Sequence, residues 1–175
     1  MGLLSAAALH GAAHQQPQEF QVLTARQMKP ALAGRSRIHF LLKKHIKRGD
    51  TVQHKTETGT MHISTPETTA LDLLRYSKYA GGLNNVATVL SELTERIDPK
   101  KLAETARRAG DLPSAQRLGF LLENIGQVEI AQPLADWMRS TAVRTIFLRP
   151  GIRNQKGDRS ARWKVIVNEQ VEAPE

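Results

Sequence analysis

The middle of the chain, residues 65–140, carries a series of helix start and stop signals and is flanked on both sides by strand patterns. Asp98 before Pro99 pairs a capping oxygen with a proline of preset φ, and Gly110 is typical of a helix end. The signals predict helices over 66–77, 83–96, 98–110 and 112–126, and a last, irregular one over 130–140. Strand patterns interrupted by a helical block indicate an α+β fold.

The strand patterns before the block begin with EFQVLTA (19–25). SRIHFLLKK (36–44) alternates in part, which predicts one buried face and one basic face. The buried face would carry Ile38, Phe40 and Leu42, and the basic face Arg37, His39 and Leu41. Residues 51–65 resemble a hairpin with Thr58 and Gly59 near its turn, so we expect a small antiparallel sheet in this third of the chain.

Strand patterns return at 144–150 and 162–168, joined by the basic loop GIRNQKGDRSA. We therefore predict a single α+β domain over residues 1–175. It would consist of a sheet-rich part (1–65), a helical block (66–140) and C-terminal strands (144–168). In this fold, about four helices pack against a small mixed or antiparallel sheet.

The first residues, MGLLSAAALHGAA, are apolar enough to suggest a signal peptide. They lack a basic start, and His10 and His14 interrupt the apolar run, so we predict a buried helix over residues 2–10 instead. No later apolar run approaches the roughly 20 residues of a membrane span. The chain has no cysteine, which excludes disulfides and thiolate metal sites. We expect a cytoplasmic protein with no membrane partner.

Two carboxylates in STPETTALDLLRY (64–76), Glu67 and Asp72, raise the question of a catalytic pair. They are five residues apart, about 140° around a helix, so they do not share a face. Thr65 or Ser64 before Pro66 is typical of a helix start, with Glu67 in its first turn. We interpret Glu67 as a capping residue and Asp72 as a surface or ion-pairing residue.

The histidines offer two candidate metal pairs, His10 with His14 and His54 with His62. The first pair is separated by Gly11 at the predicted helix end, and the second has no evident third ligand. We favour structural or surface roles and predict no metal site. Phosphate-binding glycine loops and nucleophile elbows do not occur in the sequence. The prediction is a non-enzymatic protein without a cofactor.

Positive charge is concentrated in two segments, 25–62 and 144–164, within a net charge of +8. The candidate residues for binding a nucleic acid or a protein partner are Arg35, Arg37, Lys43, Lys44, Lys47, Arg48, Arg149, Arg153, Lys156 and Arg159. Such side chains contact phosphates without reading bases, or meet an acidic protein surface. A solvated basic surface explains the pattern equally well.

The stretch GLLSAAALHGAAHQQPQEFQVLT, a basic strand, and then STPETTALDLLRY and AGGLNNVATVLSEL resemble the C-terminal domain of the AbiEi antitoxin family of type IV toxin–antitoxin systems. The likeness covers about residues 2–95, and RWKVIVN near the end is similar more loosely. The resemblance implies an α+β antitoxin domain that opposes a nucleotidyltransferase-type toxin.

Family members usually carry an N-terminal winged helix-turn-helix domain that binds the operator of their own operon. They are DNA-binding transcriptional regulators of abortive infection, a phage defence. This sequence begins where that domain would already have ended, so we expect the antitoxin role without operator-specific repression. The alternative hypothesis is a non-specific module that binds DNA or RNA through its basic surface.

Overall fold

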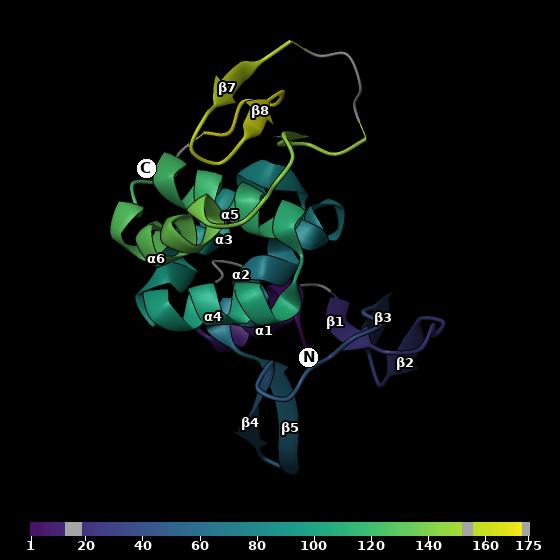
Figure 1. The fold of residues 1–175 in the computed structure, drawn as a ribbon. Helices are drawn as coiled ribbons and strands as arrows, with labels where there is room; N and C mark the ends of the chain where they lie inside the picture. Colours follow the sequence, from purple (N-terminus) through teal and green to yellow (C-terminus); the bar gives the residue numbers. More distant parts are fainter. Residues whose placement is uncertain (13–18, 152–155, 173–175) are drawn as a thin grey trace.

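A central block of helices with small sheets at its two ends makes up the structure, a computed structural model that describes residues 1–12, 19–151 and 156–172 (Figure 1). The helices are α1 (Leu3–Leu9), α2 (Pro66–Arg75), α3 (Gly82–Leu93), α4 (Pro99–Ala109), α5 (Leu112–Asn124) and α6 (Val128–Arg139), with 3₁₀ turns η1 (Ser77–Ala80) and η2 (Thr94–Arg96). The α+β fold predicted from the sequence is confirmed.

The starts of α2, α4 and α5 are capped by side chains. Thr65 Oγ1 accepts a hydrogen bond from the Thr68 amide (3.1 Å), and Asp98 Oδ1 accepts from the amides of Lys100 and Lys101 (2.9 and 3.0 Å). Asp111 does the same for Ser114 (3.2 Å). These bonds satisfy amides that have no partner inside their own helix.

The core of the block is aliphatic, as the scarcity of aromatic residues predicts. Helix α2 lies at its centre and contacts α1, α3, α4 and α5. Leu73, Leu74, Leu90, Leu118 and Leu122 are almost completely buried. Among the described residues, no helix is long and apolar enough to span a bilayer.

The first sheet contains β1 (Glu19–Thr24), β2 (Ala31–Ala33) and β3 (Ser36–Leu42) in the order β1-β3-β2. Its β1–β3 pair is parallel, so the antiparallel sheet predicted for this part of the chain is only partly correct. A β2 strand that the sequence did not reveal pairs with β3 antiparallel. It lies in the connection that returns the chain to the start of β3.

The predicted hairpin forms a separate sheet of β4 (Thr51–Thr56) and β5 (Gly59–Ser64). The third sheet contains β6 (Ile146–Phe147), β7 (Asp158–Ser160) and β8 (Val165–Val167) in the order β6-β8-β7. Strand β7 lies within the segment predicted to be only a basic loop. The third sheet contacts α5, while the first two lie near α1 and α2 at the other end of the block (Figure 1).

One face prediction is wrong. In β3, Leu41 is 4% exposed and belongs to the core, whereas Leu42 is 41% exposed. The buried face of β3 is therefore the one that the sequence assigned to Arg37, His39 and Leu41. Alternation gives the period of a strand, but it does not say which face the helices will cover.

Candidate functional site

A charged cleft lies where the chain leaves β3 and passes α2 and the end of α4. It has a volume of about 330 Å³ and is lined by Leu42, Lys43, Lys44, His45, Lys47, Asp50, Arg75 and Ala109. Below it, a space of only about 20 Å³ lies among Asp50, Asp72 and Asp111. That lower space is about the size that holds one water, so it does not admit a substrate.

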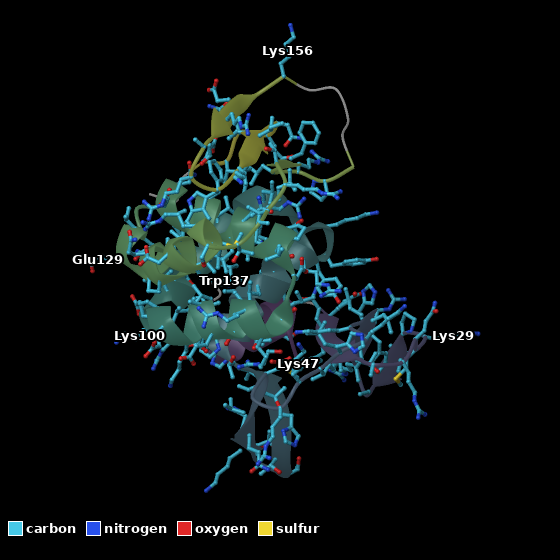
Figure 2. All side chains as sticks on the ribbon, in the orientation of Figure 1. Lys29, Lys47, Lys100, Glu129, Trp137 and Lys156 are labelled. Atoms are coloured by element: carbon cyan, nitrogen blue, oxygen red, sulfur yellow. The ribbon has the colours of Figure 1, made fainter. Side chains whose placement is uncertain are left out.

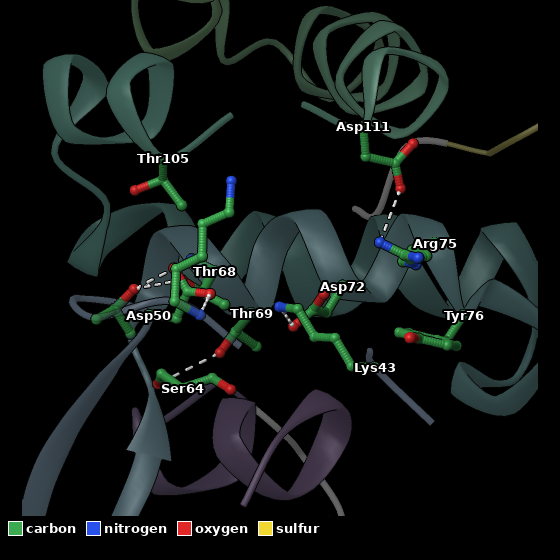
Figure 3. A network of polar contacts seen from close by, with 12 residues as sticks. Lys43, Asp50, Ser64, Thr68, Thr69, Asp72, Arg75, Tyr76, Thr105 and Asp111 are labelled. Atoms are coloured by element: carbon green, nitrogen blue, oxygen red, sulfur yellow. Dashed lines mark hydrogen bonds and ion pairs between the residues drawn. The ribbon is translucent and has the colours of Figure 1, made fainter. Parts of the chain in front are cut away.

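Each carboxylate at the base of the cleft is paired with a cation (Figure 3). Lys43 Nζ lies 2.8 Å from Asp72 Oδ2, and both side chains are almost fully buried. Arg75 Nη1 lies 3.4 Å from Asp111 Oδ2.

Asp50 makes the third ion pair and also holds the loop that precedes it. Arg108 Nη2 lies 3.0 Å from Asp50 Oδ1, and the Lys47 amide donates to Asp50 Oδ2 (2.9 Å). The Lys47 ammonium donates to the Arg108 carbonyl. The network thus ties the β3–β4 loop to α2, α4 and the start of α5, which is a structural role.

Burial is the main influence on Asp72. It raises the pKa of that carboxyl above the usual aspartate value, while the Lys43 ammonium and, more weakly, the Arg75 guanidinium act in the opposite direction. Burial likewise raises the pKa of the Tyr76 phenol, whose hydroxyl donates to the Leu42 carbonyl (2.7 Å). Both groups hold β3 against α2.

Glu67 and Asp72 have separate structural tasks. Glu67 is buried, and its Oε1 accepts a hydrogen bond from the Asp98 amide (3.1 Å), at the start of α4. Glu67 therefore satisfies an amide at the start of α4. Of the two residues proposed from the sequence as the cap of α2, Thr65 and Ser64, the structure uses Thr65. The ion-pairing interpretation of Asp72 is confirmed, and the surface alternative is wrong.

The candidate pair His54 and His62 is not brought together. His54 pairs across the hairpin with Met61, and His62 pairs with Gln53, so the two histidines lie on opposite faces. His10 Nε2 is hydrogen-bonded to the Ser64 carbonyl (2.7 Å), and His14 lies outside the described residues. Within the described ranges, no three His, Asp or Glu side chains are grouped to hold a metal ion.

The predicted basic residues of the first segment do not lie together in the structure. Lys44 and Lys47 line the cleft, and Lys43 is buried in its ion pair, so it adds no charge to the surface. Arg48 is exposed in the β3–β4 loop. Arg35 lies exposed in the β2–β3 turn, and Arg37 Nη1 lies 3.3 Å from Glu19 Oε1.

The basic residues of the second segment lie at the opposite end of the molecule, where Figure 2 labels Lys156. Arg149 Nη1 lies 2.7 Å from Glu169 Oε2, and Arg159 Nη2 donates to Thr145 Oγ1 (3.0 Å). Arg153 lies outside the described residues. The structure therefore separates the two segments, and they do not form one continuous surface.

Sequence reasoning missed Asp50, Arg108 and Asp111 as members of the network. Asp50 had a visible signal, because it is one of only two acids among the many cations of residues 25–62. Arg108 is 58 residues away from it, so only the fold shows the pairing.

Comparisons with known proteins agree with this fold. The family model of the AbiEi antitoxin C-terminal domain matches residues 1–124, which confirms the resemblance seen in the sequence. No curated protein matches the chain. The crystal structure of the RV2827C protein from Mycobacterium tuberculosis is similar, with a TM-score of 0.65 and 12% identity. That similarity covers 95% of this chain and 61% of the other, and it supports the fold alone.

Proposed function

The chain belongs to the AbiEi antitoxin family, and we propose that it is a non-enzymatic antitoxin domain that counteracts a nucleotidyltransferase toxin of a type IV toxin–antitoxin system. The family match over residues 1–124 carries the proposal. The carboxylates of Asp50, Asp72 and Asp111 support the proposal. Each is engaged in an ion pair and is not free to act as a general acid or base.

The first basic segment offers exposed Arg35, Lys44, Lys47 and Arg48 on one end of the molecule. In direct binding of the toxin, complementary charge would speed the encounter more than it raises the final affinity. In competition for the toxin's nucleic-acid or nucleotide substrate, the same basic surface would serve. We place this action in the cytoplasm, with transcriptional regulation and phage defence by abortive infection as predictions from the family.

Co-expression with the nucleotidyltransferase gene next to this one tests the proposal. We expect the wild-type chain to restore growth to cells that express the toxin. A Leu73→Asp variant places a charge at a fully buried core position and should lose both soluble folded protein and rescue. Soluble wild-type protein that does not restore growth would refute the proposal.

A second candidate function, non-specific binding of DNA or RNA, is favoured by one observation. Residues 20–49 contain no aspartate or glutamate, and several of their cations are exposed. Such binding weakens steeply with salt, in proportion to the phosphates contacted. Charge reversal at Arg35, Arg37 and Lys44 should flatten that dependence, whereas reversal at Lys100, an exposed lysine on α4, should not. Lys43 is left out because it is buried. Binding that does not respond to salt would exclude this function.

A further inference from the structure

A groove lies between α6 and the turn that joins β7 to β8, at the end of the molecule that carries the third sheet (Figure 1). Its volume is about 480 Å³, which is within the usual range of small-molecule sites. Helix α6 supplies the buried side chains of Ala135 and Met138 as its floor, and Val143 lines it from the segment that follows α6. Both α6 and the third sheet lie beyond residue 124, so the groove is outside the family match.

The wall of the groove is positively charged. Arg139, Arg162 and Lys164 line it, and no aspartate or glutamate does so within the described part of the chain. Arg139 and Arg162 each have an acidic partner. Lys164 has no ion-pair partner among the described residues, and its ammonium donates to the Val143 carbonyl (3.3 Å). An ammonium carries three protons, so two are left for a ligand.

The backbone of Lys164 is in the left-handed region, with a φ of 51°. Glycine and asparagine adopt this conformation more readily than lysine does, and residues held in it are concentrated at binding sites. Lys164 is the last residue of the β7–β8 turn, so glycine there would keep the turn and remove the side chain. The ammonium that lines the groove gives a reason for lysine at this position.

The two walls of the groove are fixed in relation to each other. Trp163, next to Lys164 in the turn, is 1% exposed. Gln116 Nε2 on α5 donates to the carbonyls of Trp163 and Arg144 (2.9 Å each). Arg162 Nη2 donates to Gln132 Oε1 on α6 (2.8 Å), which joins the turn to the opposite wall. The groove is therefore preformed, and a ligand does not have to order it.

We propose that this groove binds a small organic anion with an apolar body, such as a carboxylate on a short hydrocarbon chain. The Lys164 ammonium would donate a charge-assisted hydrogen bond to the carboxylate. Ala135, Met138 and Val143 would remove the hydrocarbon from water. The groove and the antitoxin function are separate properties of the chain, and each can fail without the other.

Other ligands fit the groove less well. An inorganic anion such as phosphate would leave the apolar floor unused, and a neutral hydrocarbon would leave the Lys164 ammonium without a partner. A nucleic-acid strand binds through several cations along its backbone. Of the three cations that line the groove, Arg139 and Arg162 are already paired.

The test uses octanoate as the probe, with octanol and octylammonium as ligands of the same length and different charge. All three are titrated below the concentration at which they form micelles, and binding is followed by NMR. We expect octanoate to bind with roughly millimolar affinity, octanol several-fold more weakly and octylammonium not at all. The methyl resonances of Ala135, Met138 and Val143 should shift with octanoate, which would place the probe in the groove.

Lys164→Gly removes the ammonium and relieves the left-handed backbone. It should keep or raise the melting temperature, weaken octanoate binding about fivefold or more, and leave octanol binding unchanged. Lys156→Gly is the matched control, because Lys156 is an exposed lysine just before β7 that does not line the groove. Its affinity for octanoate should stay within about twofold of the wild type.

Ala161→Phe tests the apolar part of the groove. Ala161 is exposed and lines the groove, so a larger side chain there should block octanoate and octanol alike while the protein stays folded. Octanoate that binds no more tightly than octanol, phosphate that binds as tightly as octanoate, or an unchanged affinity in Lys164→Gly would overturn the proposed site. Shifts spread over the surface, without the three methyl groups, would also overturn it. Growth rescue by the wild type is unaffected by these outcomes and tests the antitoxin function separately.

Discussion

At the scale of single residues, the buried Lys43–Asp72 pair is the most consequential contact of the charged cleft. Removing one member of a buried ion pair leaves an uncompensated charge, which typically costs about 3–5 kcal/mol, whereas replacing both members with apolar residues is often neutral. We expect Lys43→Met to lower the free energy of unfolding by that amount at neutral pH, and Lys43→Met with Asp72→Leu to recover most of it. Denaturant unfolding of the wild type, Lys43→Met, Asp72→Leu and the double variant measures the coupling.

The pH dependence of the same variant follows from Asp72. Because burial raises its pKa in the folded state, the folded chain binds this proton more tightly than the unfolded chain. The resulting stability is complete below the usual aspartate value of 3.8 and is lost as pH rises through the raised folded value. The penalty of Lys43→Met should therefore shrink as the pH falls toward 4. A penalty that does not change with pH would contradict the assigned cause.

Gly119, on the buried side of α5, is required by the close approach of Trp163. A Cβ built at this position would lie 2.1 Å from Trp163 Cζ3. Gly119→Ala gains helix propensity of about 1 kcal/mol, but overpacking of this kind costs about 1–3 kcal/mol and the overlap here is severe. We expect a net loss in the free energy of unfolding. In a Trp163→Leu background the same change should be neutral or stabilising, and a loss of equal size there would contradict the steric reason.

At the scale of elements, the capping side chain of α4 offers a test by pH. Backbone amides of Lys101 and then Lys100 hold the pKa of Asp98 below its usual value. A lowered folded pKa means that this stability is present above the unfolded value of 3.8 and is lost as pH falls through the folded value. Asp98→Ala should lower the melting temperature at pH 7, with a smaller difference near pH 3. Asp98→Asn keeps a capping oxygen and should retain most of the stability. If the loss of melting temperature in Asp98→Ala grew as the pH fell, the Asp98 carboxylate would not be its source.

The helices could be predicted from the sequence because their signals are local. Pro66, Asp98 and Gly110 mark the ends of helices through their own backbone and side-chain chemistry, and the structure has those ends within a few residues. The buried face of a strand cannot be predicted in this way, because it depends on which elements of the fold pack against the sheet. Ile38 and Leu42 alternate as a buried face would, and nothing nearby in the sequence says that α1 and α2 cover the other side.

The ion-pair network shows the same limit. The sequence indicates that Asp72 is a surface or ion-pairing residue, but it does not identify the partner, because Lys43 is 29 residues earlier in the chain. The opposite placement of the two basic segments is also a property of the fold. Each segment lies in or beside a sheet at its own end of the helical block, so the two have different neighbours (Figure 1).

At the scale of the whole molecule, the helical block divides the charge between two ends. Each end has ion pairs of its own: Arg37 with Glu19 at the first end, and Arg149 with Glu169 and Arg162 with Glu123 at the second. The charged cleft lies at the first end, and its carboxylates hold the β3–β4 loop and the helices together.

The central claim of the proposal is that this chain counteracts a nucleotidyltransferase toxin without catalysing a reaction itself. Growth of cells that co-express the toxin tests that claim most directly, with the wild-type chain compared with Glu67→Gln, which removes a buried carboxylate charge and keeps an oxygen that can accept from the Asp98 amide. The account predicts that both proteins restore growth. Soluble wild-type protein that leaves growth arrested, or loss of rescue by a folded Glu67→Gln variant, would contradict the account.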